Sequence, residues 1–241
     1  MTEPTVPHPA VVDPETGTPL APRPKPGYYG KFDVMSQQKF WDAKTRSVVV
    51  DRVANVPVLR HFDEGAANFW YAVFEQLIPQ SDRTPERRIP ILPRVDERLF
   101  EGKGPGYRFA DMPHDAKAYE LGREAIDAEA SALGGAPFLQ LDPAKQSETL
   151  ERIHAGKPQA APEIWERMGI KNFWSLILGD AVEAYYAHPW SWDEIGFGGP
   201  AYPRGYVRLE EGQPEPWEAT ERPYAWAPPP GIVSGEKQAA K

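Results

Sequence analysis

The clearest pattern of apolar and polar positions along the chain lies between Phe62 and Pro79. Apolar residues recur there at steps of three and four, which is the period of one face of an α-helix. They are Ala66, Phe69, Trp70, Val73, Phe74 and Leu77. Asp63 is a good N-cap, and Glu64 places an acidic group in the first turn. The pattern therefore predicts a helix with one buried face that begins after Asp63 and ends before Pro79.

Three more helices are predicted between residues 91 and 158. The first covers 91–100, and the second opens at Met112-Pro113 and ends at the glycine pair 134–135. The third follows Asp142 as N-cap, with proline at the first helical position, and closes at 156–158. Their apolar stripes are Ile91, Leu92, Val95 and Leu99, then Tyr119, Gly122, Ile126, Ala130 and Leu133, then Leu150 and Ile153.

The most apolar segment covers residues 162 to 186. Its apolar residues occupy most of the circumference of a helix, which is typical of a helix buried on all sides. They are Trp165, Met168, Phe173, Trp174, Leu176, Ile177, Leu178, Ala181, Ala184 and Tyr185. We expect this segment to be the central, nearly enclosed helix of the domain. It should end at His188, because the residue before a proline is disfavoured in the helical region.

Proline and aromatic residues are dense at both ends of the chain. Proline lacks a backbone N–H and favours extended backbone. Residues 1–60 are therefore predicted to form an extended N-terminal arm, and residues 190–241 an irregular aromatic C-terminal arm, on either side of a helical core over 61–189. Within the first arm, residues 45–53 are β-branched enough for a short strand, and a short helix fits almost as well. The predicted fold class is mainly α, a small helical bundle with long proline- and aromatic-rich arms.

The composition supports a folded chain and excludes several functions. Eight Trp, ten Tyr and ten Phe are too many for a disordered chain. A net charge of -8 without a long basic run argues against nucleic-acid binding. Without cysteine, the chain has no disulfide, thiolate zinc site or cysteine nucleophile. No stretch approaches the ~18 apolar residues of a membrane span.

No catalytic, metal or cofactor motif is recognisable in the sequence. The five histidines do not stand at an HxxxH or HExxH spacing, no GxSxG elbow occurs, and the glycines at 102–106 and 196–199 lack the GxGxxG pattern between a strand and a helix. Asp193 and Glu194 are neighbouring carboxylates without a second partner in the sequence, and a general acid needs a cleft and a shifted pKa. The histidines are His8, His61, His114, His154 and His188. We therefore assign no catalytic, cofactor-binding or metal-binding residue.

The segment 188–206 is the most unusual part of the chain. Glycine and proline fix an irregular backbone there that carries six aromatic or imidazole side chains, and Arg204 is available for a carboxylate. Such a segment either fills its own core or anchors a partner, and we favour the partner because Trp, Tyr and Arg dominate interface hot spots. The predicted partner-binding residues are Tyr28, Tyr29, Trp41, His188, Trp190, Trp192, Glu194, Phe197, Arg204, Tyr206 and Trp217.

Several motifs along the chain carry a resemblance to a known family. They are Leu77-Ile78-Pro79 and the segments 184–189, 192–201, 203–207, 30–41 and 216–219. Over about residues 28 to 220 the chain resembles the gluconate 2-dehydrogenase subunit 3 family, the small subunit associated with flavin-dependent oxidoreductases of the glucose-methanol-choline type.

The resemblance implies that FAD and the reacting histidine belong to a large partner subunit, while the small subunit supports folding, stability or export of the pair. This chain is then expected to hold no cofactor, and the substrate is a sugar, sugar acid or other alcohol chosen by the partner. Some family members carry a twin-arginine export signal and work beside a membrane cytochrome c subunit. No twin-arginine segment precedes the core here. We therefore expect a cytoplasmic chain, or a periplasmic one if an export signal was removed or is supplied by the partner.

Two other classes of function stay open at this point. One is an independent small enzyme, an isomerase or lyase that uses His188, Asp193 and Glu194. The other is a chaperone that releases its client after folding.

Overall fold

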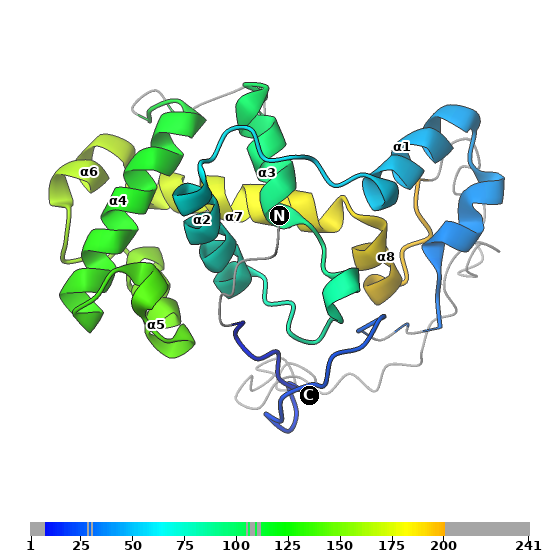
Figure 1. Cartoon of the computed structure of the whole chain (residues 1–241), viewed down its shortest axis with the longest axis horizontal. Coiled ribbons are helices and arrows are strands. Elements are labelled where there is room, and N and C mark those ends of the chain that lie inside the picture. The colour runs from blue at the N-terminus through cyan, green and yellow to red at the C-terminus, as the bar shows by residue number, and fades with distance from the viewer. Residues whose placement is uncertain are drawn as a thin grey trace, which may run out of the picture.

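The structure is a computed structural model that describes residues 8–27, 29, 31–104, 106, 109 and 112–200 (Figure 1). In these ranges all named elements are helices, and the strand-like pairings are limited to two isolated bridges, Val12 with Pro19 and Arg23 with Arg83. The mainly α fold class is confirmed. No helix in the described part of the chain is long and apolar enough to cross a membrane.

Four predicted helices form where the sequence places them. They are α2 (Glu64–Leu77), α3 (Ile91–Phe100), α4 (Asp115–Gly134) and α5 (Pro143–His154). Asp63 Oδ1 accepts a hydrogen bond from Ala66 N at 2.7 Å, and Asp142 Oδ1 accepts one from Lys145 N at 2.9 Å. These caps satisfy backbone donors that the helix itself leaves unpaired. Gly135 ends α4 with a φ of 73°, a left-handed conformation that favours glycine.

The main hydrophobic core lies where α2, α3, α4, α5 and α7 (Ile170–Tyr186) meet. Trp70 of α2 is fully buried, and its ring lies 4.6 Å from the ring of Tyr119 and 6.4 Å from that of Phe173. Gly122 of α4 lets the Phe173 ring approach the α4 backbone so closely that a Cβ atom at position 122 would overlap it. The core therefore depends on close contact between α4 and α7.

The segment 162–186 is not the single enclosed helix that the sequence predicted. It divides into α6 (Pro162–Met168) and α7, because Gly169 stands between them with a φ of 69° and a ψ of 112°. In α7 one narrow face is buried, while Val182 and Tyr186 are 40% and 48% exposed. The more enclosed helix is α2, where Ala72, Val73, Phe74 and Glu75 are buried in succession.

The N-terminal region combines an extended segment with two helices. Residues 8–27 lie along the core without a helix, held by contacts such as Val11 N to Ser81 Oγ at 2.7 Å and Arg23 N to Asp82 O at 2.8 Å. Residues 34–54, expected to be extended, instead contain the short 3-10 helix η1 (Val34–Phe40) and α1 (Ala43–Ala54).

Of the two interpretations of residues 45–53, the helix is correct and the strand is wrong. Asp42 caps this helix, because its Oδ1 accepts a hydrogen bond from Thr45 N at 2.6 Å. β-branched residues lower helix propensity only slightly, so a good cap and the burial of Val49 outweigh them.

The chain forms another helix beyond His188, inside the predicted irregular arm. Helix α8 (Pro189–Ile195) begins with Pro189 at its first position, where the missing N–H does no harm. The remaining short elements are η2 (Pro85–Arg87) and η3 (Phe138–Gln140). Figure 1 shows α8 beside α1 at one end of the molecule, with α4, α5 and α6 at the other.

Helix α8 belongs to a second, smaller hydrophobic cluster. It consists of Val34, Trp41, Val49 and Trp192, with Phe32 and Met35 packed against them. This N-terminal cluster, as we call it, joins η1 and α1 to the segment that carries the unusual aromatic motif.

Candidate functional site

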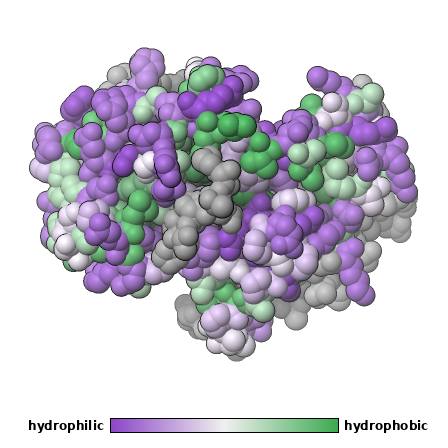
Figure 2. All heavy atoms as spheres, viewed as in Figure 1, coloured by the Kyte–Doolittle hydropathy of each residue, from purple (hydrophilic) through white to green (hydrophobic). Residues whose placement is uncertain are grey.

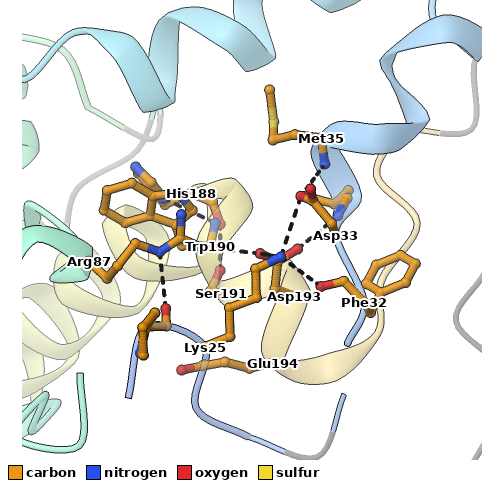
Figure 3. A network of polar contacts seen from close by, with 12 residues as sticks. Lys25, Phe32, Asp33, Met35, Arg87, His188, Trp190, Ser191, Asp193 and Glu194 are labelled. Atoms are coloured by element: carbon orange, nitrogen blue, oxygen red, sulfur yellow. Dashed lines mark hydrogen bonds and ion pairs between the residues drawn. The ribbon is translucent and has the colours of Figure 1, made fainter. Parts of the chain in front are cut away.

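The motif that the sequence singles out forms a network of polar contacts around α8 (Figure 3). Three parts of the chain meet there: the extended N-terminal segment with Lys25, the loop around η2 with Arg83 and Arg87, and α8 with Asp193 and Glu194. These parts are far apart in sequence, so the network fixes the position of α8 on the rest of the fold.

Glu194 is held by a buried arginine and a tyrosine. The Arg83 side chain has no exposed surface, and its guanidinium forms an ion pair with Glu194 Oε1. Tyr185 of α7 donates from its hydroxyl to Glu194 Oε2 at 2.8 Å. Burial raises the pKa of Glu194, although the Arg83 charge opposes this, and burial also raises the pKa of Tyr185. The carboxylate therefore connects α8 to α7 and to the η2 loop.

Asp193 connects α8 to the N-terminal region. Its Oδ1 accepts a hydrogen bond from Val34 N at 2.8 Å, and its Oδ2 lies 3.4 Å from both Lys25 Nζ and the Arg87 guanidinium. The side chain is buried, and this burial raises its pKa, while the Val34 N–H and the Lys25 charge lower it. Asp193 thus caps the start of η1 from a helix 159 residues away in the sequence.

His188 is the N-cap of α8 and lies inside the protein. Its Nδ1 accepts a hydrogen bond from Trp190 N at 3.2 Å, and the residue is 3% exposed. Burial lowers its pKa to about 3, with further lowering by the charges of Arg83 and Arg94. The imidazole is therefore neutral at neutral pH, and Nε2 carries its proton.

The aromatic residues predicted to anchor a partner divide into buried and accessible ones. Trp41 and Trp192 are buried in the N-terminal cluster, and Trp192 Nε1 donates to Tyr186 O at 2.6 Å. A Cβ atom at Gly199 would lie 2.8 Å from Trp41 Cζ2, so glycine is required for this packing. Trp41, Trp192 and His188 are therefore buried within their own chain, and their contact with a partner stays a prediction.

Four of the predicted partner-binding residues are at least partly accessible. Trp190 is half-buried with the Arg87 guanidinium 4.3 Å from its ring centre, and Tyr29 and Glu194 are also half-buried. Phe197 is 39% exposed and has its ring edge against Trp192. The other four predicted contacts lie outside the described residues: Tyr28, Arg204, Tyr206 and Trp217.

The sequence interpretation missed the cations of this network. Lys25, Arg83 and Arg87 stand in proline-containing segments that gave no helical or strand pattern. The available signal was Asp193-Glu194 itself, because two carboxylates beside buried aromatic residues need cationic partners. Their identity could not be read from the sequence, since Arg83 and Glu194 are 111 residues apart.

The carboxylates of the network are taken up by contacts within the chain. Among the residues that the structure describes, no group of three or more His, Asp or Glu side chains could hold a metal ion. Its carboxylates are instead paired with guanidinium, ammonium, hydroxyl and backbone N–H groups.

In the described residues, helices build the fold, and the charged side chains of its most distinctive motif hold separate segments together. The described part of the chain is therefore a small helical fold whose terminal helix is held by ion pairs. The chain belongs to the gluconate 2-dehydrogenase subunit 3 family, whose sequence model matches residues 64–199, more than half of the chain. The match begins at α2 and ends just after α8, so it includes Arg83, Tyr185 and Glu194 but not Lys25. No match was found among curated proteins or among solved structures.

Proposed function

We propose that this chain is the non-catalytic small subunit of a heteromeric FAD-dependent sugar or alcohol dehydrogenase. In this proposal it supports the folding or stability of a large subunit that carries FAD and the reacting groups. Membership of the gluconate 2-dehydrogenase subunit 3 family supports the assignment to a dehydrogenase complex. The identity of the substrate and the electron acceptor then belongs to the partner.

The observation that carries the non-catalytic role is the use of the motif's acid and base groups inside the fold. A general acid or base must reach the proton that it transfers. His188 accepts from a backbone N–H within α8, Asp193 accepts from Val34 N, and Glu194 is paired with Arg83 and Tyr185. These are the groups that an independent isomerase or lyase would have needed, and each has a structural partner instead.

A co-expression experiment tests the supporting role. The large subunit is produced with and without this chain, and soluble yield and FAD per polypeptide are measured by flavin absorbance. We expect the large subunit alone to aggregate or to lack most of its FAD. Normal soluble holoenzyme in the absence of this chain would contradict the proposal.

The same preparations separate a stable subunit from a releasing chaperone. A subunit should elute with the flavoprotein at a fixed ratio in size-exclusion chromatography, because an obligate interface does not dissociate at working concentrations. A substoichiometric amount of this chain beside fully active flavoprotein would identify the chaperone instead. Activity of the purified single chain on a polyol would favour the independent enzyme.

A further inference from the structure

An exposed apolar linker crosses the molecule between α1 and α2. Val56 is 57% exposed and Val58 is 75% exposed, which is a large fraction for consecutive apolar positions on one segment. Figure 2 shows hydrophobic residues gathered over this linker, on the face seen in Figure 1. Within the described part of the chain, the backbone of residues 56–59 forms no hydrogen bond. The linker therefore exposes apolar side chains beside backbone N–H and C=O groups that have no hydrogen-bond partner in the described residues.

A groove of about 600 Å3 runs beside this linker. Its walls come from the linker, from α2, the loop between α2 and α3 and the start of α3, and from Trp190 of α8. Most of the lining side chains are aliphatic, aromatic or proline, as in sites that bury apolar groups. Trp190, which is half-buried and which the sequence predicts as a partner contact, therefore lines this groove together with other apolar side chains.

A second pocket, of about 390 Å3, lies on the other side of His188, which lines both spaces. Four cations line it together with the carboxylates of Glu97, Asp180 and Glu183. Arg94 has Glu97 as its partner, and Arg98 has Asp115 and Asp180. Arg52, in the last turn of α1 before the linker, has no such partner in the described part of the chain.

Among the described residues, no carboxylate lies within ion-pair distance of Arg52. Its guanidinium donates to Ala187 O at 2.8 Å, and the neighbouring Arg94 donates to Asn55 O at 2.8 Å at the start of the linker. Burial and the charge of Arg94 lower the pKa of Arg52. Two guanidinium groups are thereby fixed next to the apolar groove, one of them without an acidic partner.

We propose that the linker, the groove and Arg52 form the docking surface for the large subunit, which inserts apolar side chains into the groove and pairs a carboxylate with Arg52. The assignment rests on the proposed function and adds the chemistry of the contact. Apolar burial supplies affinity, and the anion requirement of Arg52 supplies specificity through charge complementarity. The partner therefore places one carboxylate at Arg52 and an apolar anchor in the groove, where Glu64, Glu75 and Glu86 disfavour further acidic groups.

Two surface variants with matched controls test this assignment. Val58→Asp places a charge in the apolar surface, and Arg52→Glu reverses the unpaired cation. Val12→Asp changes a valine that is 46% exposed and lines neither space, and Arg167→Glu reverses an exposed arginine on α6. Each variant is co-expressed with the flavoprotein that co-purifies with the wild-type chain, and affinity is measured with circular dichroism as the check on folding.

We expect Val58→Asp and Arg52→Glu each to raise Kd by about tenfold or more, as for charged changes at interface positions. Both controls should bind like the wild type. If the wild type binds the flavoprotein and the two variants bind as tightly, only the surface assignment is overturned. If the wild-type chain binds no flavoprotein, the proposed function is overturned as well. A Val58→Asp variant that binds normally but melts earlier would show that another part of this chain covers the groove. A wild-type homodimer that is dissociated by Val58→Asp would identify a second copy of the chain as the occupant. Either result overturns the assignment.

Discussion

Arg83 is the residue on which the position of α8 depends most directly. Its buried guanidinium contacts Glu194 and the Tyr185 hydroxyl. Removing one partner of a buried ion pair leaves the other charge uncompensated, which costs about 3–5 kcal/mol. We expect Arg83→Ala to lower the free energy of unfolding by about 3 kcal/mol. The midpoint and slope of guanidinium unfolding measure this change.

Arg167→Ala is the matched control for this prediction, since Arg167 is exposed on α6. A surface arginine without a buried partner should change stability by less than about 0.5 kcal/mol. If Arg83→Ala unfolds at the wild-type midpoint, the ion pair does not hold α8 in place.

His188 gives the fold a defined sensitivity to acid. Its pKa is lowered from 6.5 to about 3 by burial, so the folded chain excludes a proton that the unfolded chain binds. Stability from this residue is complete above pH 6.5 and decreases as the pH falls toward 3. The full loss, reached below pH 3, is about 5 kcal/mol, from about 1.4 kcal/mol for each pKa unit. Urea unfolding at several pH values between 7 and 4 measures the slope.

The variant His188→Asn isolates this contribution, because asparagine can cap α8 but does not titrate. Its stability should depend less on pH than that of the wild type in this range. Asp193 and Glu194 act in the opposite sense, since their raised pKa values make stability fall as the pH rises through those values. They are present in both proteins, so the comparison removes them. Equal slopes would show that His188 is protonated in the folded chain.

Residue-scale features were predictable where the physics is local. The N-caps Asp63 and Asp142 were identified from the sequence because a cap bonds a backbone N–H only a few residues away. The burial of Trp41 and Trp192 was not, because each depends on a segment more than a hundred residues distant. An aromatic side chain looks the same in the sequence whether it fills its own core or a partner's surface.

At the scale of elements, the contact of α4 with α7 depends on Gly122 of α4, whereas Gly179 of α7 takes no part in it. Gly122 lies against the Phe173 ring, where an added Cβ would overlap, whereas nothing lies within 4 Å of a Cβ built on Gly179. Overpacking of a core costs about 1–3 kcal/mol, which exceeds the gain of about 1 kcal/mol from alanine in a helix. We expect Gly122→Ala to destabilise the chain by about 1 kcal/mol. Thermal unfolding measures this.

Gly179→Ala is the control within the same pair of helices. It should raise stability by about 0.5–1 kcal/mol, because alanine adds helix propensity and meets no neighbour. Equal effects of the two substitutions would mean that α4 and α7 are not in close contact at Gly122.

The helices were predicted correctly where the apolar periodicity agreed with the N-cap and helix-breaking residues at their ends. In α2 and α5 an N-cap, an apolar stripe and a terminal breaker all indicated the same limits. In the segment 162–186 the apolar residues suggested one enclosed helix, and the single Gly169 that divides it was overlooked. Helix α8 was read as irregular because its proline was taken as an ending, although proline is also favoured at a helix start.

At the scale of the whole molecule, the chain has a main core and the separate N-terminal cluster. The family match covers the main core and α8, while Val34, Trp41 and Val49 come from residues before it. The link between the two parts is α8, which contributes Trp192 to the cluster and Glu194 to the network with Arg83. The sequence could predict the helical core, but not that the N-terminal region folds back onto a helix near residue 190. Such pairings join segments with no local signal for each other.

This arrangement predicts that the N-terminal cluster can be loosened while the main core stays folded. Replacing a buried tryptophan by alanine costs about 3–5 kcal/mol, and the loss at Trp192 falls on a cluster with few other large side chains. Local units can open with free energies well below that of global unfolding. In Trp192→Ala we therefore expect amide hydrogens of η1 and α1 to exchange at least about tenfold faster than in the wild type, with those of α2 and α4 unchanged.

Phe197→Ala is the matched control, because Phe197 contacts Trp192 but is itself 39% exposed and should contribute little to the cluster. Hydrogen exchange read by mass spectrometry separates the two regions by peptide. Faster exchange in α2 and α4 together with α1 would mean that the cluster and the core unfold as one unit, and the separate role of α8 as their link would then be wrong. Exchange confined to η1 and α1 would show that α8 carries the N-terminal region as an attachment to the family core.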